Sequence, residues 1–218
     1  MNIEKFKENV ISLMSYQNGD EKFAALRVYT HGMASSRFAK AINFAVKCLE
    51  EGEFYAEIGT YSGFSLISAG YENTSPCIGI DDLSMPDFFK KEHSEGAKNS
   101  IREILHTNMN TFGFSNLKHI ESDFRNVVFD ESQKGKMGVL LIDGKHTAAE
   151  VNDTLTWATP YLSKDSVILF DDVSMADVSH AVCDLWKVGG DLLYYAGTKC
   201  HSEVSGYGVA IMAIKKAA

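Results

Sequence analysis

The stretch Phe54-Tyr-Ala-Glu-Ile-Gly-Thr-Tyr-Ser-Gly-Phe-Ser65 decides how this chain folds. An apolar run ends at Glu57, Gly59 and Gly63 follow, and an apolar pattern with helical spacing begins at about Ser62. This order predicts a strand, a glycine turn and a helix. Glycine permits positive φ and lets a ligand lie against the backbone, while a new helix presents free N–H groups. The stretch is therefore either a ligand-binding turn or an ordinary tight strand-to-helix turn.

Glu57 indicates the charge of such a ligand. A carboxylate at this turn repels phosphate but attracts an ammonium group or a ribose hydroxyl. The sequence contains neither the dinucleotide fingerprint G-x-G-x-x-G nor the P-loop pattern G-x-x-x-x-G-K-[ST] at this turn. The turn therefore predicts a cationic ligand rather than a polyphosphate, and it disfavours a NAD-dependent oxidoreductase.

A second apolar run, Cys77–Ile80, ends in the acids Asp81 and Asp82. An acid about 20 residues beyond a glycine turn is positioned to bind ribose hydroxyls. Glu57-x-Gly59-x-x-x-Gly63 followed by Ile-Asp81 resembles the first two motifs of class I S-adenosylmethionine-dependent methyltransferases. That cofactor carries an ammonium, a sulfonium and a ribose but no phosphate. The resemblance implies these cofactor contacts: Glu57, Gly59, Tyr61, Ser62, Gly63, Ser65, Asp81, Asp123 and Asp143.

Alternating apolar runs and helical patterns predict an α/β fold with a mostly parallel sheet. We expect strands at 54–58, 77–81, 117–121, 137–142, 166–170, 191–196 and 207–214. We expect helices between them at 62–71, 94–112, 147–162 and 176–188. No helix separates the last two strands, so 191–214 is predicted to be an antiparallel hairpin at the sheet edge. The resemblance implies the same arrangement, a Rossmann-like, doubly wound, seven-stranded sheet with helices on both faces.

The residues before the first strand carry no recognisable motif. We expect one helix over residues 1–17, an irregular polar stretch over 18–32, and a second helix from Ser35 or Ser36 to Glu51 that stops at Gly52. The expected organisation is a helical extension over 1–51 and a methyltransferase domain over 52–218. The extension could cover the cofactor, cover the substrate or form the contact of a homodimer, and the sequence does not choose.

Size and composition narrow the class of protein. The chain has 218 residues, of which 45% are hydrophobic and 23% charged, as in an ordinary globular protein with one buried core. Its net charge of −8 disfavours nucleic acid as a partner. We find no apolar run of about 18 residues and no signal-peptide pattern, so we expect a cytoplasmic protein without a membrane partner. Its 4 cysteines are scattered, which disfavours a disulfide framework or a zinc site.

The loop over residues 82–93 interrupts the regular alternation. It follows the second strand, at the end of the sheet where open α/β folds bind ligands. Phe88 and Phe89 are apolar residues in this polar loop. They suit a lid or substrate pocket, and they equally suit packing on the sheet edge.

Acids also follow the fourth and fifth predicted strands. Val139–Ile142 precedes Asp143-Gly-Lys-His146, and Val167–Phe170 precedes the pair Asp171-Asp172. Adjacent parallel strands end on the same side of a sheet, so these acids should converge with His146. Clustered carboxylates repel one another unless a positive group lies among them, and an oxygen set favours Mg²⁺, Mn²⁺ or Ca²⁺ over zinc. The acids could instead cap helices or bind loop N–H groups, and His146 could be a surface residue beside the helix cap.

The pattern Asp143-Gly-x-His146 followed by Phe-Asp171-Asp172-Val resembles the small-molecule O-methyltransferases that include the macrocin and mycinamicin enzymes, and the likeness extends over about residues 52–215. It implies that Asp143, Asp171 and Asp172 hold Mg²⁺ and that His146 is the general base. The catechol O-methyltransferases are more distantly similar, with lysine at the third residue after the first aspartate and an Asp-Asn pair. A group named cephalosporin hydroxylases shares these motifs, so the substrate is not implied.

The expected function is an S-adenosylmethionine-dependent O-methyltransferase, assisted by a divalent metal, that acts on a small hydroxylated molecule. Two alternatives stay open. One is a metal-independent methyltransferase in which the aspartates only shape the pocket. The other is a non-catalytic protein that binds S-adenosylmethionine.

Overall fold

The described parts of the chain, residues 1–15, 20–84, 95–197 and 208–215 of a computed structural model, form a seven-stranded sheet with strand order β3-β2-β1-β4-β5-β7-β6. The strands are β1 (Phe54–Ile58), β2 (Cys77–Ile80), β3 (Leu117–Ile120), β4 (Met137–Ile142), β5 (Leu162–Asp171), β6 (Asp191–Ala196) and β7 (Val209–Lys215). β7 runs antiparallel to both neighbours, and the pairs among β1 to β5 are parallel. The predicted fold class is confirmed.

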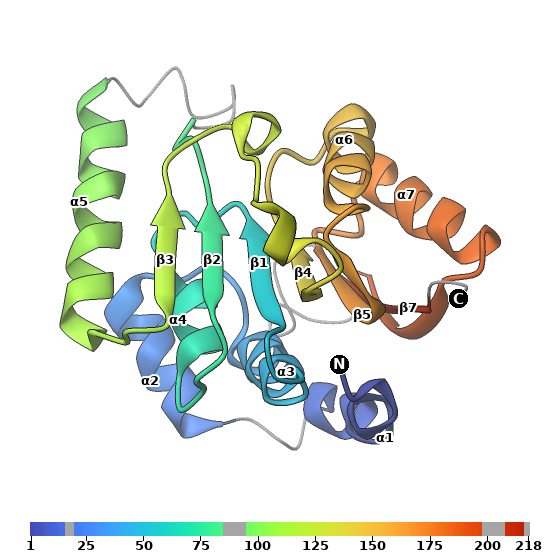
Figure 1. Ribbon diagram of the computed structural model, residues 1–218. Helices are drawn as coiled ribbons and strands as arrows, with labels where there is room; N and C mark the ends of the chain where they lie inside the picture. Colours follow the sequence, from blue (N-terminus) through green and yellow to red (C-terminus); the bar gives the residue numbers. More distant parts are fainter. Residues whose placement is uncertain (16–19, 85–94, 198–207, 216–218) are drawn as a thin grey trace.

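Helices cover both faces of this sheet (Figure 1). They are α1 (Ile3–Met14), α2 (Glu21–Thr30), α3 (Ser36–Lys47), α4 (Phe64–Gly70), α5 (Glu95–Phe112), α6 (Ala148–Ala158) and α7 (Ala176–Lys187). Successive strand residues point to opposite faces, so Tyr55 packs in the core with α1, α3 and α4, while Ala56 packs in the core with α6 and α7. Strands with all residues buried, such as β1 and β4, are apolar on both sides for this reason.

The N-terminal segment differs from expectation, because a helix occupies the stretch predicted to be irregular. α2 begins after Asp20, whose carboxylate accepts the N–H of Lys22. Its buried residues Phe23 and Leu26 pack with Phe64 of α4. The apolar residues of α2 do not gather on one face, since Val28 and Tyr29 are exposed, so its stability comes from this tertiary contact rather than from a clear sequence pattern.

Three element boundaries also differ from the predicted ones by four residues each. α3 ends at Lys47 instead of Glu51, and Gly52, with φ of 80°, lies in the turn before β1. α6 ends at Ala158 instead of residue 162, and β5 begins at Leu162, four residues earlier than expected. Pro160 lies between these two elements, and a proline opposes continuation of the helix.

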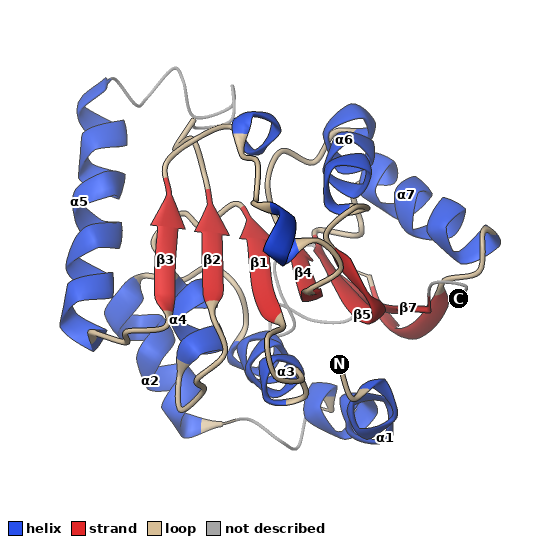
Figure 2. Cartoon of the chain, in the orientation of Figure 1, coloured by secondary structure: helices blue, strands red, loops and turns tan. Residues whose placement is uncertain are grey.

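The carboxyl ends of the parallel strands meet at one edge of the sheet (Figure 2). Ile58 of β1 is in register with Ile80 of β2 and Ile142 of β4, and Ile142 is in register with Phe170 of β5. The residues just after these positions include the glycine turn and every acid predicted to act at strands two, four and five. The sheet therefore brings the predicted site together at a single edge.

Gly59 lies where two of these strand ends touch. Its φ is 94°, and a Cβ atom there would lie 2.0 Å from the carbonyl oxygen of Asp143. Only glycine fits both the backbone angle and the close approach. The turn after β1 and the acid after β4 are therefore packed backbone against backbone.

Two further properties concern the whole described chain. None of its helices combines the length and apolar character needed to cross a bilayer. Cys48 and Cys77 are buried free thiols and Cys183 is an exposed free thiol, while Cys200 lies outside the described residues.

Candidate active site

A pocket of about 710 Å³ opens at the carboxyl edge of the sheet. This volume is within the range of roughly 300–1,000 Å³ that is usual for small-molecule sites. Most of the predicted cofactor contacts line it, namely Gly59, Tyr61, Ser62, Ser65, Asp81, Asp123 and Asp143. Glu57 and Gly63 are not among the lining residues. The structure thus gathers the predicted residues around one cavity, with two of them behind its wall.

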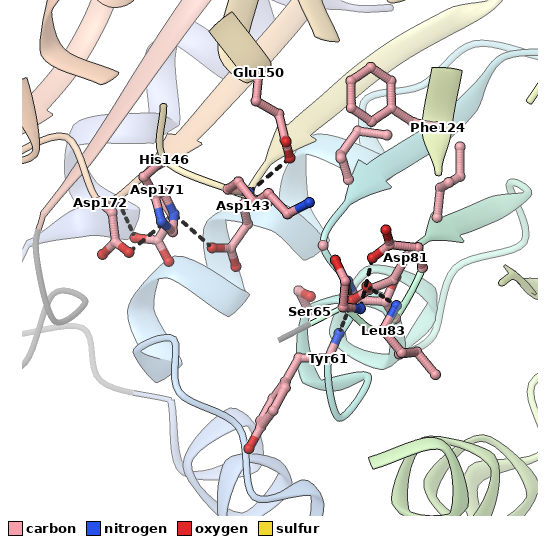
Figure 3. Close-up of a pocket in the computed structure, with 18 of the residues that line it drawn as sticks. Tyr61, Ser65, Asp81, Leu83, Phe124, Asp143, His146, Glu150, Asp171 and Asp172 are labelled. Carbon is pink, nitrogen blue, oxygen red and sulfur yellow. Dashed lines mark hydrogen bonds and ion pairs between the residues drawn. The ribbon is translucent and has the colours of Figure 1, made fainter. Parts of the chain in front are cut away.

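Asp81 holds the glycine turn in place (Figure 3). Its Oδ2 accepts the backbone N–H groups of Thr60 at 2.8 Å and Tyr61 at 2.9 Å, and its Oδ1 accepts that of Leu83 at 2.7 Å. Tyr61 has φ of 46°, an uncommon backbone conformation for this residue type. Two turn N–H groups that a phosphate would need are therefore already occupied. A carboxylate has roughly four acceptor positions, so Asp81 retains capacity for a ligand hydroxyl.

Glu57 lies beneath the turn and has 0% exposed surface. The Tyr55 hydroxyl donates to its Oε2 at 2.6 Å, while its Oε1 is buried without a hydrogen-bond partner among the described residues. Burial raises the pKa of Glu57 to about 7, although the Tyr55 hydrogen bond and the nearby hydroxyls of Ser65 and Thr60 oppose the shift. Its direct contact with a cofactor stays a prediction, because Glu57 is fully buried and does not line the pocket.

Arg125, which the sequence did not single out, occupies the pocket wall beyond β3. Its guanidinium lies 3.1 Å from Asp123 and 2.9 Å from Asp153, and 4.5 Å from the centre of the Phe124 ring. Asp123 also accepts the N–H of Arg125 at 2.9 Å. Asp123, one of the predicted cofactor contacts, is therefore paired with a neighbouring cation.

Asp143, His146 and Asp172 converge at the other side of the pocket (Figure 3). The Nε2 atom of His146 lies 3.2 Å from Oδ2 of Asp172 and 3.8 Å from Oδ1 of Asp143. One ligand atom from each residue falls within 4.8 Å of the others, which is compatible with a shared metal ion. Burial and then the nearby Asp172 carboxylate raise the pKa of Asp143 well above its ordinary range. The neighbouring carboxylate therefore opposes ionisation of Asp143, and a bound cation would favour it.

Asp171 has a different environment from its neighbour Asp172. Asp171 is only 5% exposed, and its Oδ1 accepts the N–H of Asp172 at 2.9 Å. Asp172 has φ of 54°, a strained conformation that is typical of functional sites. The compact group of possible ligands contains His146 in place of Asp171, which differs from the all-oxygen set expected from the sequence. The metal role of Asp171 stays a prediction.

Two carboxylates hold the loop that carries His146. Glu150 accepts the N–H of Lys145 at 2.9 Å, and Asp177 of α7 accepts the N–H of Ala148 at 3.0 Å. Thr147 is the N-cap of α6, and its hydroxyl accepts the N–H of Glu150. The hydrogen bond from Ala148 to Asp177 joins two different helices, so no local sequence pattern predicted it.

The N-terminal segment also reaches the pocket, through Met33 and Ala34 between α2 and α3. Asn108 of α5 donates to the carbonyl oxygens of Thr30 at 3.2 Å and Ser62 at 2.8 Å, and it thereby ties this connection to the glycine turn. From the predicted loop 82–93, Asp82, Leu83 and Ser84 line the pocket. Phe88 and Phe89 lie outside the described residues.

Solved structures with the same fold are similar to the whole chain. The O-methyltransferase TomG from Streptomyces achromogenes, solved in complex with SAM, is 12% identical, with a TM-score of 0.62 and coverage of 99% of this chain and 100% of TomG. A putative O-methyltransferase from Klebsiella pneumoniae is 13% identical, with a TM-score of 0.58 and coverage of 91% of this chain and 92% of the Klebsiella chain. The O-methyltransferase NovP is 15% identical, with a TM-score of 0.59 and coverage of 82% of this chain and 80% of NovP.

Sequence comparisons give the family. No curated protein matches the chain. The family model described as a methyltransferase domain matches residues 56–173, which begin in β1 and end just after the acidic pair. This match spans more than half of the chain and includes the glycine turn, Asp81 and the Asp143–Asp172 group. The chain is therefore a methyltransferase and belongs to the methyltransferase-domain family.

Proposed function

We propose that this methyltransferase transfers a methyl group from S-adenosylmethionine to a hydroxyl group of a small molecule, with help from a divalent cation. The observation that carries the proposal is a single pocket with the Asp81-braced turn at one side and the Asp143–His146–Asp172 group at the other. The similarity to TomG, which was solved with SAM, and to NovP supports the cofactor and the class of acceptor atom.

The cofactor side of the pocket suits a cation without phosphate. The turn N–H groups of Thr60 and Tyr61 already bind the Asp81 carboxylate, which leaves neither of them for a phosphate. We assign the ribose hydroxyls to Asp81 and the adenine edge to the region of Asp123. We assign the methionine portion to Gly59, Tyr61, Ser62, Gly63, Ser65 and Asp143, with Glu57 supplying negative charge from below.

The acidic group suits a hard divalent cation such as Mg²⁺. Asp143 and Asp172 offer carboxylate oxygens close to the buried, unbonded Nε2 atom of His146. Two carboxylates this close repel each other, and a cation would relieve that repulsion. We assign Asp143 and Asp172 as the residues that would hold it, and Asp171 stays the third carboxylate ligand predicted from the sequence. A bound cation would supply positive charge that lowers the pKa of an acceptor hydroxyl.

His146 has the position of a general base. In the proposed reaction, the acceptor oxygen forms a bond to the methyl carbon, and the bond between that carbon and sulfur breaks with its electron pair remaining on sulfur. The hydroxyl proton passes to Nε2 of His146, because a neutral imidazole accepts protons near neutral pH. The neighbouring Asp172 stabilises the imidazolium that forms. Glu150 and Asp177 keep the histidine loop in place during this step.

A second arrangement of the same residues follows from the distances, with His146 as the third metal ligand rather than the base. Both arrangements predict slow turnover without His146, but only the ligand role predicts weaker metal binding. Calorimetric titration of Mn²⁺ into the wild type and His146→Ala separates them. Unchanged metal affinity supports the base, and a loss of more than about tenfold supports the ligand.

Calorimetry also tests the cofactor. The purified protein should bind S-adenosylhomocysteine and should not bind NAD under the same conditions. S-adenosylhomocysteine release from S-adenosylmethionine, measured by mass spectrometry in the presence of a hydroxylated acceptor, then distinguishes an enzyme from a non-catalytic binding protein. Binding of NAD instead of S-adenosylhomocysteine would overturn the proposal.

A further inference from the structure

Two methionines are exposed to solvent on the wall of the pocket. Met33, between α2 and α3, is 66% exposed, and Met175, which precedes α7, is 42% exposed. The N–H of Met175 donates to the carbonyl oxygen of Asp172 at 2.9 Å, so this side chain starts one turn from the acidic group. Such large apolar side chains gain free energy when a ligand covers them.

The connection that carries Met33 is firmly docked on the cofactor turn. Asn108, which is 8% exposed, binds the carbonyl oxygens of both Thr30 and Ser62. A Cβ atom at Gly32 would lie only 2.3 Å from the Phe64 ring, so the backbone presses against the first residue of α4. Met33 therefore directly follows a segment that is held against the glycine turn and the start of α4.

The charge of the pocket restricts what can cover these methionines. Acidic side chains outnumber basic ones on its wall: Asp81, Asp82, Asp123, Asp143, Glu150, Asp171 and Asp172 against Arg125 and Lys145. Arg125 is already paired with Asp123 and Asp153. An anionic acceptor would therefore meet more acidic than basic side chains there. Methionine, by contrast, is flexible, apolar and favourable against aromatic rings.

We propose that Met33 and Met175 determine acceptor specificity, by contacting an uncharged, flat apolar ring that carries the reacting hydroxyl. This inference rests on the proposed function and adds to it the class of acceptor and a role for the N-terminal segment. Met33 and Ala34 form one wall of the acceptor space, and Met175 at the start of α7 forms another. A polyhydroxylated acceptor without an apolar ring would leave both methionines in water.

The test measures binding of three probes by NMR titration, with saturating S-adenosylhomocysteine and Mg²⁺ and again without them. The probes are 2-naphthol, 6-hydroxy-2-naphthoate and methyl α-D-glucopyranoside. They compare an uncharged ring, the same ring with a carboxylate, and an uncharged polyol. We expect 2-naphthol to bind at least roughly fivefold more tightly than the naphthoate and roughly tenfold more tightly than the glucoside.

Substitutions assign the preference to the two methionines. Met33→Ser and Met175→Ser should each weaken 2-naphthol binding by roughly five- to tenfold, while Met33→Leu should preserve it, because leucine keeps the apolar volume. Val28→Ser and Val188→Ser are matched controls, since these residues are 73% and 80% exposed and do not line the pocket. Neither control should change probe binding, and all variants should keep the wild-type melting temperature within about 2 °C.

The outcomes separate this inference from the proposed function. Normal S-adenosylhomocysteine binding with equal or tighter binding of the glucoside or the naphthoate would overturn the acceptor class alone. An unchanged 2-naphthol affinity in both serine variants, or no binding of 2-naphthol, would remove the methionines from that role. Loss of S-adenosylhomocysteine binding in the wild type would instead contradict the proposed function.

Discussion

The two sides of the pocket differ in how their acids are satisfied. On the cofactor side, Asp81 binds three backbone N–H groups, so the chain itself stabilises this carboxylate. On the acceptor side, carboxylate oxygens of Asp143 and Asp172 lie close to each other and to His146. Asp81 therefore braces the backbone before any ligand arrives, whereas on the acceptor side a cation would relieve the repulsion between two carboxylates. The buried Glu57 lies between these two cases, with one oxygen bonded and one unbonded.

The largest expected effect is on the acceptor side, at His146. His146→Ala should lower kcat by roughly 10²–10⁴-fold, the usual contribution of a general base, and should leave S-adenosylhomocysteine affinity nearly unchanged. His146→Gln preserves the shape without basicity and should be equally slow. Steady-state kinetics and calorimetry on the same preparations measure both quantities. A loss below about threefold would show that His146 is structural.

The next effect concerns Glu57 and the dependence of stability on pH. Because its pKa is raised from 4.5 to about 7, the folded protein retains a proton that the unfolded chain has lost between these values. Stability should therefore decrease as pH rises through this window, and the penalty should reach about 3 kcal/mol above pH 7.

Urea unfolding of the wild type and Glu57→Gln tests this linkage. Glutamine cannot ionise, so the variant should be more stable than the wild type at pH 8 and similar to it at pH 4. The informative quantity is the change, from pH 4 to pH 8, in the stability difference between the variant and the wild type. A change in packing affects stability at both pH values equally and cancels. An equal difference at both would show that Glu57 ionises normally in the folded protein.

Metal binding should separate Asp172 from Asp171. Asp172→Asn should weaken Mn²⁺ binding by more than about tenfold, because it removes a carboxylate from the converging group. Asp171→Asn is the matched control, and an equally large loss there would restore the all-oxygen set expected from the sequence. Turnover should fall after treatment with EDTA and recover with Mg²⁺. A turnover rate indifferent to EDTA would favour the metal-independent alternative.

The smallest effect is expected on the cofactor side. Asp81→Ala should weaken S-adenosylhomocysteine binding by at least about tenfold, or ~1.4 kcal/mol, through loss of the ribose contact. It should also lower stability, because three backbone N–H groups lose their acceptor. Asp81→Asn keeps one acceptor oxygen, so its cofactor affinity and its stability should lie between those of the wild type and Asp81→Ala. Unchanged affinity in Asp81→Ala would remove this residue from the ribose role.

Local patterns predicted most of the fold. The strand at 54–58 and the strand at 137–142 were predicted to the residue, because each is a short, mostly apolar run bounded by charged residues or glycine. α2 was missed, since its buried residues Phe23 and Leu26 give too weak a period to stand out from a polar stretch. The end of α6 was placed too late, because Leu162 continues the helical apolar spacing although it belongs to β5.

The candidate site was predictable in its members but not in its geometry. The sequence by itself determined the strand-turn-helix order at Gly59 and the presence of acids at the ends of four strands. These acids share one side of the sheet because the carboxyl ends of parallel strands lie together. Only the tertiary structure decided that Asp81 braces the turn, that Asp171 bonds to the backbone while Asp172 faces His146, and that Met33 reaches the pocket. These facts depend on the direction of each side chain and on contacts between segments far apart in sequence, such as Asn108 with Thr30. A local pattern carries no information about such contacts, because they depend on which distant segments pack together and form hydrogen bonds in the folded chain.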